Sequence, residues 1–133
     1  MFSNITRINS EGNSIKVNSI GIQQEKCFGL SWGSKKIFFD NSITATSINN
    51  DQYLLIIEST SPETLIVLKP DSSELFSLHP PKLNGKYLNF LYPQIHKIDR
   101  KLVGLVFTDG KIDYKTSFSL ENPSYDKLIE VPK

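Results

Sequence analysis

The chain has 133 residues, one cysteine and a formal net charge of +1. This length is typical of one domain that buries a core of its own, and a lone cysteine excludes an intramolecular disulfide framework. The near-neutral charge argues against nucleic-acid binding, which needs an excess of basic side chains.

The composition favours strands over helices. One alanine, Ala45, stands against fifteen isoleucines and sixteen serines. Alanine is the best helix former, whereas isoleucine and the aromatic residues fit a half-buried pleated surface. No apolar run approaches the ~20 residues that span a bilayer, and residues Met1–Asn13 lack the basic and apolar parts of a secretory leader. We therefore expect an all-β protein of the cytoplasm with no membrane partner.

Short apolar segments alternate with turn signals along the whole chain, which predicts strands. In the first part the predicted strands are Ile5–Ile8, Ile15–Ile22, Lys26–Trp32 and Lys36–Asp40. In the second part they are Ile43–Ile48, Gln52–Ser59, Thr64–Lys69 and Glu74–Leu78. In the third part they are a weak strand near Lys82–Asn84, then Lys86–Tyr92, Lys101–Thr108 and Lys111–Phe118, with an insertion at Pro93–Arg100. Leu128–Val131 is expected to add an edge strand or to lie in a tail.

A three-fold sequence repeat divides these strands into units. Phe38, Phe76 and Tyr114 are each 38 residues apart, and each follows a short polar turn that closes a hairpin. Self-similarity at such a period marks a repeat architecture. We expect one domain over residues 1–133, with repeats at 1–40, 41–80 and 81–118 and an extension at 119–133. The alternation around the three aromatic residues predicts that they lie in the core.

The turns carry a resemblance to β-propeller blades. They are Asn50-Asp51-Gln52-Tyr53-Leu54-Leu55, Asn84-Gly85-Lys86-Tyr87-Leu88 and Asp109-Gly110-Lys111. The resemblance implies three four-stranded antiparallel blades. Because propellers close with about four to eight blades, three blades imply an open half-propeller. Its two exposed sheet edges would allow a homodimer. The alternative is a β-trefoil or another three-fold β fold.

No reaction signature occurs in the sequence. There is no Gly-x-Ser-x-Gly elbow, the glycines are isolated, and the carboxylates lack the spacing of a ligand loop, so we expect no cofactor, no metal and no enzyme. Cys27 has no partner for nucleophilic catalysis and is expected to be a core or surface thiol. One catalytic alternative stays open: a ribonuclease in which His79 and His96 act with Lys97 or Lys86. That chemistry needs both imidazoles in one cleft.

Charge is divided between the second and third units. Residues 37–81 carry a net charge of −5, and residues 82–116 carry +4. Opposite potentials of this kind steer association with a charged partner, although solvated turns account for them equally well. Trp32 and Tyr92 stand at strand ends as candidate anchors of an interface, with core packing as the alternative for each. The predicted partner-binding acids are Asp40, Asp51, Glu58, Glu63, Asp71 and Glu74.

The general character of the chain resembles the immunity proteins of bacterial contact-dependent growth-inhibition systems. The resemblance implies a protein that neutralises a toxin, expected to be a basic nuclease, by covering its substrate cleft. The acids would stand where substrate phosphates lie. A lectin-like or small-ligand-binding domain is the alternative, and it would require exposed aromatic residues repeated in phase.

Overall fold

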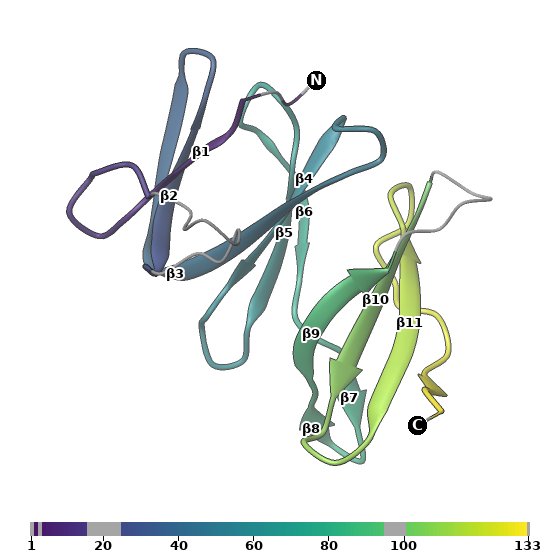
Figure 1. Cartoon of the computed structure of the whole chain (residues 1–133). Helices are drawn as coiled ribbons and strands as arrows, with labels where there is room; N and C mark the ends of the chain where they lie inside the picture. Colours follow the sequence, from purple (N-terminus) through teal and green to yellow (C-terminus); the bar gives the residue numbers. More distant parts are fainter. Residues whose placement is uncertain (1, 3, 16–24, 95–100, 133) are drawn as a thin grey trace.

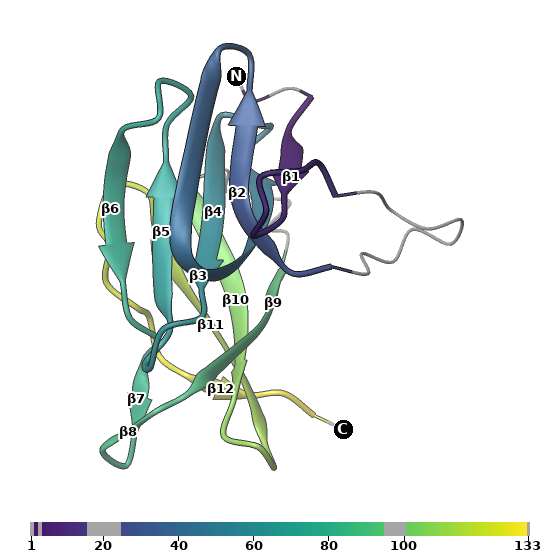
Figure 2. The same ribbon diagram turned by 90° about the vertical axis from the view of Figure 1, so that its left-hand side faces the viewer.

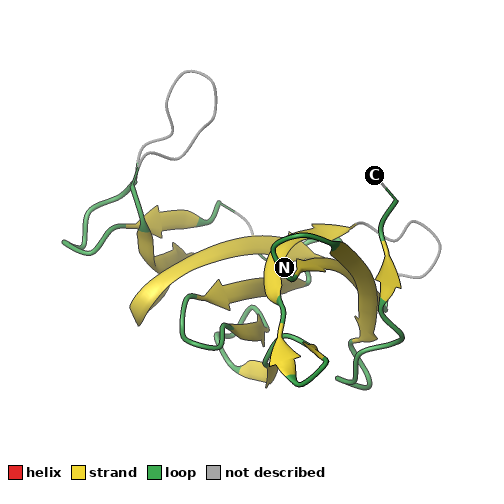
Figure 3. Ribbon diagram, turned by 90° about the horizontal axis from the view of Figure 1, so that it is seen from below, coloured by secondary structure: helices red, strands yellow, loops and turns green. Residues whose placement is uncertain are grey.

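The computed structural model describes residue 2 and residues 4–15, 25–94 and 101–132. Every regular element in these ranges is a β-strand (Figure 3). The strands are β1 (Thr6–Ile8), β2 (Cys27–Trp32), β3 (Lys35–Ile48), β4 (Tyr53–Glu58), β5 (Thr64–Leu68), β6 (Glu74–Leu78), β7 (Lys82–Leu83), β8 (Lys86–Tyr87), β9 (Asn89–Gln94), β10 (Leu102–Thr108), β11 (Asp113–Ser119) and β12 (Ile129–Glu130). The prediction of an all-β protein is confirmed, and no helix of the described residues is long and apolar enough to cross a membrane.

The strands form antiparallel sheets of six, four and two strands (Figures 1 and 2). The six-stranded sheet has the order β1-β2-β3-β4-β5-β6, and the four-stranded sheet has the order β12-β11-β10-β9. β7 and β8, which follow β6 and precede β9 in the chain, form a small hairpin. The prediction of three four-stranded blades is therefore not confirmed, and this division has no three-fold symmetry that would suit a trefoil.

Strand β3 explains why the first two predicted units do not separate. The sequence Asp40-Asn41-Ser42 looks like a turn between two strands, but β3 runs through it without a break. The first half of β3 pairs with β2 and its second half pairs with β4. The polar side chains at the changeover find partners on β4 and just after it: Asn41 Nδ2 donates to Glu58 Oε2 at 3.1 Å, and the hydroxyls of Ser42 and Ser59 lie 2.7 Å apart. Because these polar side chains have hydrogen-bond partners, the chain continues as a strand and does not turn here.

Strands β4 and β5 are buried on both faces. In β4, Leu54 and Ile56 face one core cluster, while Leu55 and Ile57 face the other. This double burial is why both strands read as continuous apolar runs instead of alternating patterns. The first cluster, here called the hairpin cluster, contains Phe2, Cys27, Leu30, Trp32, Ile43, Ala45, Leu54, Ile56, Ile66 and Leu68. The second, the interlayer cluster, contains Leu55, Ile57, Leu65, Val67, Leu88, Val103, Leu105, Phe107 and Phe118 and joins the two large sheets.

The 38-residue sequence repeat corresponds to hairpins and not to propeller blades. Phe38, Phe76 and Tyr114 each lie on the second strand of a hairpin, in β3, β6 and β11. Their surroundings differ, because Phe76 and Tyr114 pack against the interlayer cluster whereas Phe38 is 57% exposed. The prediction of a core position is therefore wrong for Phe38.

The extension after β11 packs against the four-stranded sheet. β12 pairs with β11, so of the two predicted alternatives, an edge strand or a tail, the structure has the edge strand. Tyr125 packs against the interlayer cluster, and its hydroxyl donates to the His79 carbonyl at 2.7 Å. Burial raises the pKa of Tyr125, so the phenol stays protonated and keeps this donor. The predicted strand Ile15–Ile22 lies outside the described residues beyond Ile15.

Candidate functional site

A groove of about 400 Å³ opens where the bend of β3 meets the edge strand β9. Four segments build its wall: the start of β2, the bend of β3, the end of β4 with the following loop, and β9. We call it the β3–β9 groove, and its lining residues are Glu25, Lys26, Cys27, Ser42, Ile43, Thr44, Ile57, Ser59, Glu63, Phe90 and Leu91.

Glu63 ties the two sheets together at this groove. Its Oε1 accepts the backbone N–H of Phe90 in β9 at 2.8 Å, and its carbonyl lies 3.0 Å from Nδ1 of His79. Charge-assisted hydrogen bonds of this kind are about twice as strong as neutral ones. The Glu63 side chain therefore holds the two sheets together in addition to carrying a charge.

β9 carries an irregularity beside the groove. Phe107 of β10 pairs with Phe90, and Val106 pairs with Tyr92, so Leu91 is the extra residue of a β-bulge. Phe90 packs against the interlayer cluster and makes an edge-to-face contact with Phe107 at 5.9 Å between ring centroids. Leu91 and Tyr92 remain 42% and 47% exposed. Two neighbouring large side chains are thus presented at a sheet edge.

The structure does not bring the six predicted acids together. Glu63 lines the groove, and Glu58 lies between two lining residues with its Oε2 bonded to Asn41. Asp51 and Asp71 lie in the β3–β4 and β5–β6 turns, at the other end of these strands. Asp40 is exposed in the first half of β3, and Glu74 is exposed at the start of the edge strand β6. The role of these acids in binding stays a prediction.

The two predicted aromatic anchors differ. Trp32 is only 6% exposed, packs in a tilted arrangement with its ring centroid 5.0 Å from that of Phe2, and donates its indole N–H to the Pro70 carbonyl at 2.8 Å. Trp32 is therefore packed in the core, as the alternative expected, and its burial gives no support to the predicted anchor role. Tyr92 is exposed and follows the lining residue Leu91 in β9, and its role as an anchor stays a prediction.

The ribonuclease alternative receives no support from the described residues. The His79 ring is engaged by the Glu63 carbonyl and lies edge-on to Tyr87, while His96 and Lys97 are outside the described residues. Within the same ranges no group of three or more metal-ligating side chains occurs. The thiol of Cys27 is buried and donates to the Gly29 carbonyl at 3.2 Å.

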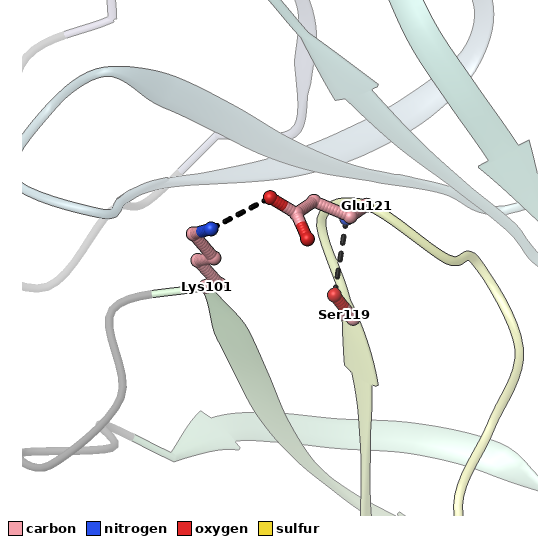
Figure 4. A network of polar contacts seen from close by, with 3 residues as sticks. All are labelled: Lys101, Ser119 and Glu121. Carbon is pink, nitrogen blue, oxygen red and sulfur yellow. Dashed lines mark hydrogen bonds and ion pairs between the residues drawn. The ribbon is translucent and has the colours of Figure 1, made fainter.

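A polar cluster where β10 begins and β11 ends has a structural explanation (Figure 4). Lys101 Nζ lies 2.7 Å from Glu121 Oε1, and the Ser119 hydroxyl accepts the backbone N–H of Glu121 at 3.1 Å. The ion pair is well exposed, and such pairs add little stability. It fastens the turn after β11 to the start of β10.

Sequence reasoning missed Leu91 and Glu25. The signal for Leu91 was Pro93, which we placed in an insertion. Proline is confined to edge strands and bulges in a sheet, so Phe90-Leu91-Tyr92-Pro93 fits an irregular edge strand. Glu25 had no comparable signal, because its position at the groove depends on the path of β3.

The comparison with solved structures finds a chain of the structure of Tne2 in complex with Tni2. It superimposes with a TM-score of 0.71 at 14% sequence identity, over 99% of this chain and 100% of that chain. The two chains share a fold. No protein-family profile matches the sequence, and no curated protein matches it.

Proposed function

We propose that this protein is an immunity protein: a non-enzymatic inhibitor that binds a bacterial toxin and covers its active site. The observation that carries the proposal is the likeness, over essentially the whole length, to a chain solved within the complex of Tne2 with Tni2. The proposal takes Tne2 and Tni2 to be a toxin and its immunity protein. A chain with this fold therefore occurs in a solved structure of two proteins in complex.

The target is proposed to be an enzyme with a cationic cleft, and a nuclease is the first class to test. The support is the acidic excess of residues 37–81, which lies in the larger sheet. Carboxylates on an inhibitor can occupy sites that bind substrate phosphates, and complementary charge speeds association. The acids are spread over both ends of that sheet. This arrangement supports a distributed acidic surface better than a single row of carboxylates that mimics the phosphates of a substrate.

The test is co-expression with the protein encoded by the reading frame next to this gene. That protein, expressed alone in a bacterial host, is expected to arrest growth, and this chain is expected to restore growth and to co-elute with it as a stable complex. Continued arrest in the presence of folded, soluble chain would contradict the proposal. Arrest without degradation of nucleic acid would remove the nuclease assignment and leave the inhibitor assignment standing.

A further inference from the structure

We propose that the β3–β9 groove, with Leu91 and Tyr92 at its rim, is the surface that docks the inhibited enzyme. Its occupant is a segment of that enzyme with a basic side chain flanked by apolar ones. This inference rests on the proposed function and deepens it by assigning the docking site.

The bulge in β9 supplies the apolar part of the surface. In a regular strand neighbouring side chains point to opposite faces, so one of Leu91 and Tyr92 would turn inward. The extra residue at Leu91 breaks this alternation, and both side chains are exposed next to each other. Bulges at sheet edges commonly re-aim side chains near functional sites. Tyrosine is also among the residues enriched in the anchors of protein interfaces, and the neighbouring leucine adds exposed apolar area beside it.

The same edge is closed to strand addition, which makes the side chains the recognition elements. A partner strand would need free backbone donors along β9. The N–H of Phe90 already donates to Glu63 Oε1, and Pro93 has no N–H to offer. Carboxylates and prolines at edges are known devices against strand pairing. A partner is therefore bound through side chains that enter the groove and not through backbone pairing with β9.

The charge of the groove favours a cationic occupant. Among the described lining residues, Glu63 and Glu25, which accepts from Asn9 Nδ2, are acidic and Lys26 is the one basic residue, and Glu58 adjoins them. Glu63 uses Oε1 for Phe90, and Oε2 has no partner among the described residues. Arginine suits this setting best, because its planar guanidinium reaches a carboxylate and also stacks on an aromatic face such as that of Tyr92.

The apolar rim is tested with Leu91→Ala and Tyr92→Ala in the toxin complex obtained by co-expression. Each variant is expected to weaken binding by about tenfold or more, as truncation of interface anchors does. The matched control is Ile129→Ala on β12, the opposite edge of the same sheet, where the side chain is 51% exposed. Equal affinity of all three variants, with unchanged thermal stability, would overturn the proposal while inhibition by the wild type stands.

The charge is tested with Glu63→Gln, which keeps an oxygen acceptor for the Phe90 N–H. The variant is expected to fold normally, to associate more slowly and to show a weaker dependence of association rate on salt. Glu74→Gln on β6 is the control. If Glu74→Gln slows association and Glu63→Gln does not, the docking surface lies elsewhere on the inhibitor.

A partner-independent arm uses two short peptides, acetyl-Leu-Arg-Leu-amide and acetyl-Leu-Glu-Leu-amide. In a ¹⁵N correlation spectrum of the full chain, the arginine peptide is expected to shift amide signals of residues 25–27, 42–44 and 90–91. The glutamate peptide is expected to leave them in place. No shift, or equal shifts with both peptides, would overturn the groove assignment whether or not the chain inhibits a toxin.

Discussion

At the scale of single residues, polar atoms inside the molecule join segments that are distant in sequence. The indole N–H of Trp32 reaches the Pro70 carbonyl, and the Arg7 guanidinium donates to the Ala45 carbonyl at 2.8 Å. The first bond connects β2 to the β5–β6 turn, and the second connects β1 to the second half of β3. Buried polar groups are costly unless they are paired. These bonds therefore help to fix how the six-stranded sheet folds on itself.

Trp32→Phe tests this role. The change removes the donor to Pro70 and leaves a partly buried carbonyl without its partner, so we expect a loss of about 1–3 kcal/mol in the free energy of unfolding. Urea denaturation followed by circular dichroism measures it. Tyr92→Phe, on an exposed ring, is the control and should change stability little. Equal stability of the two variants would contradict the role assigned to Trp32.

Gly29 is required by the close approach of β3. A Cβ at this position would lie 2.6 Å from Phe38 Cδ1 and 2.9 Å from the Ile37 carbonyl oxygen. The exposed Phe38 ring can move away, but the backbone oxygen cannot do so without disturbing the β2–β3 pairing.

We expect Gly29→Ala to lower the free energy of unfolding by about 1–3 kcal/mol, as overpacking does. The double variant Gly29→Ala with Phe38→Ala should recover part of the loss and not all of it, because the clash with the Ile37 carbonyl remains. Urea titrations of both variants measure the difference. Full recovery in the double variant would show that the ring alone sets the constraint.

At the scale of elements, the turns are fixed by local hydrogen bonds that the sequence encodes. In the β10–β11 turn, Asp109 Oδ1 accepts the backbone N–H of Ile112 at 2.7 Å and that of Lys111 at 2.8 Å. These bonds favour the charged carboxylate and lower the pKa of Asp109 below its ordinary value of 3.8. The Ser73 hydroxyl and N–H lower the pKa of Asp71 in the β5–β6 turn in the same way.

A lowered folded-state pKa has a definite sign in stability. The contribution of Asp109 is fully present above the unfolded pKa and is lost as the pH falls through the folded one, below 3.8. Asp109→Asn keeps an acceptor but does not titrate, so its free energy of unfolding should fall less steeply than that of the wild type on acidification from about pH 5 to pH 2. Urea titrations at several pH values measure the two slopes. Parallel slopes would contradict the assignment.

At the scale of the whole molecule, β4 and β5 couple the two core clusters. Their side chains alternate between the hairpin cluster and the interlayer cluster, so neither cluster can lose its packing without exposing one face of both strands. A strand buried on both faces therefore belongs to both core clusters. We therefore expect one cooperative unfolding transition.

Leu105→Ala measures this coupling. Leu105 is fully buried in the interlayer cluster, and the single tryptophan, Trp32, lies in the hairpin cluster. The substitution should cost about 2–5 kcal/mol and shift the urea midpoint seen by Trp32 fluorescence as far as the midpoint seen by circular dichroism. A shift in circular dichroism alone would show that the two clusters unfold independently.

Homodimer formation stays a prediction at this scale. The edge strand β9 is closed by Glu63 and Pro93, which leaves β1, β6 and β12 as sheet edges for a second copy. The half-propeller whose two exposed sheet edges prompted the idea is not confirmed. Light scattering of the purified chain measures its mass.

The sequence by itself determined the strand content, most strand positions and the turns, because these depend on neighbours within a few residues. β4, β5 and β6 lie within one or two residues of their predicted bounds, and the Asp109-Gly110 hairpin is present. The 38-residue sequence repeat likewise reports a local feature, the aromatic residue that follows each turn.

Only the tertiary structure decided the partition of the sheets, the burial of Trp32 and the existence of the groove. The passage of β3 through Asn41-Ser42 depends on partners at Glu58 and Ser59, which are 17 residues away in the chain. The exposure of Leu91 depends on the register between β9 and β10. Contacts of this range are set by which strands pair and how the sheets pack, and a pattern of side chains along one chain does not specify that choice.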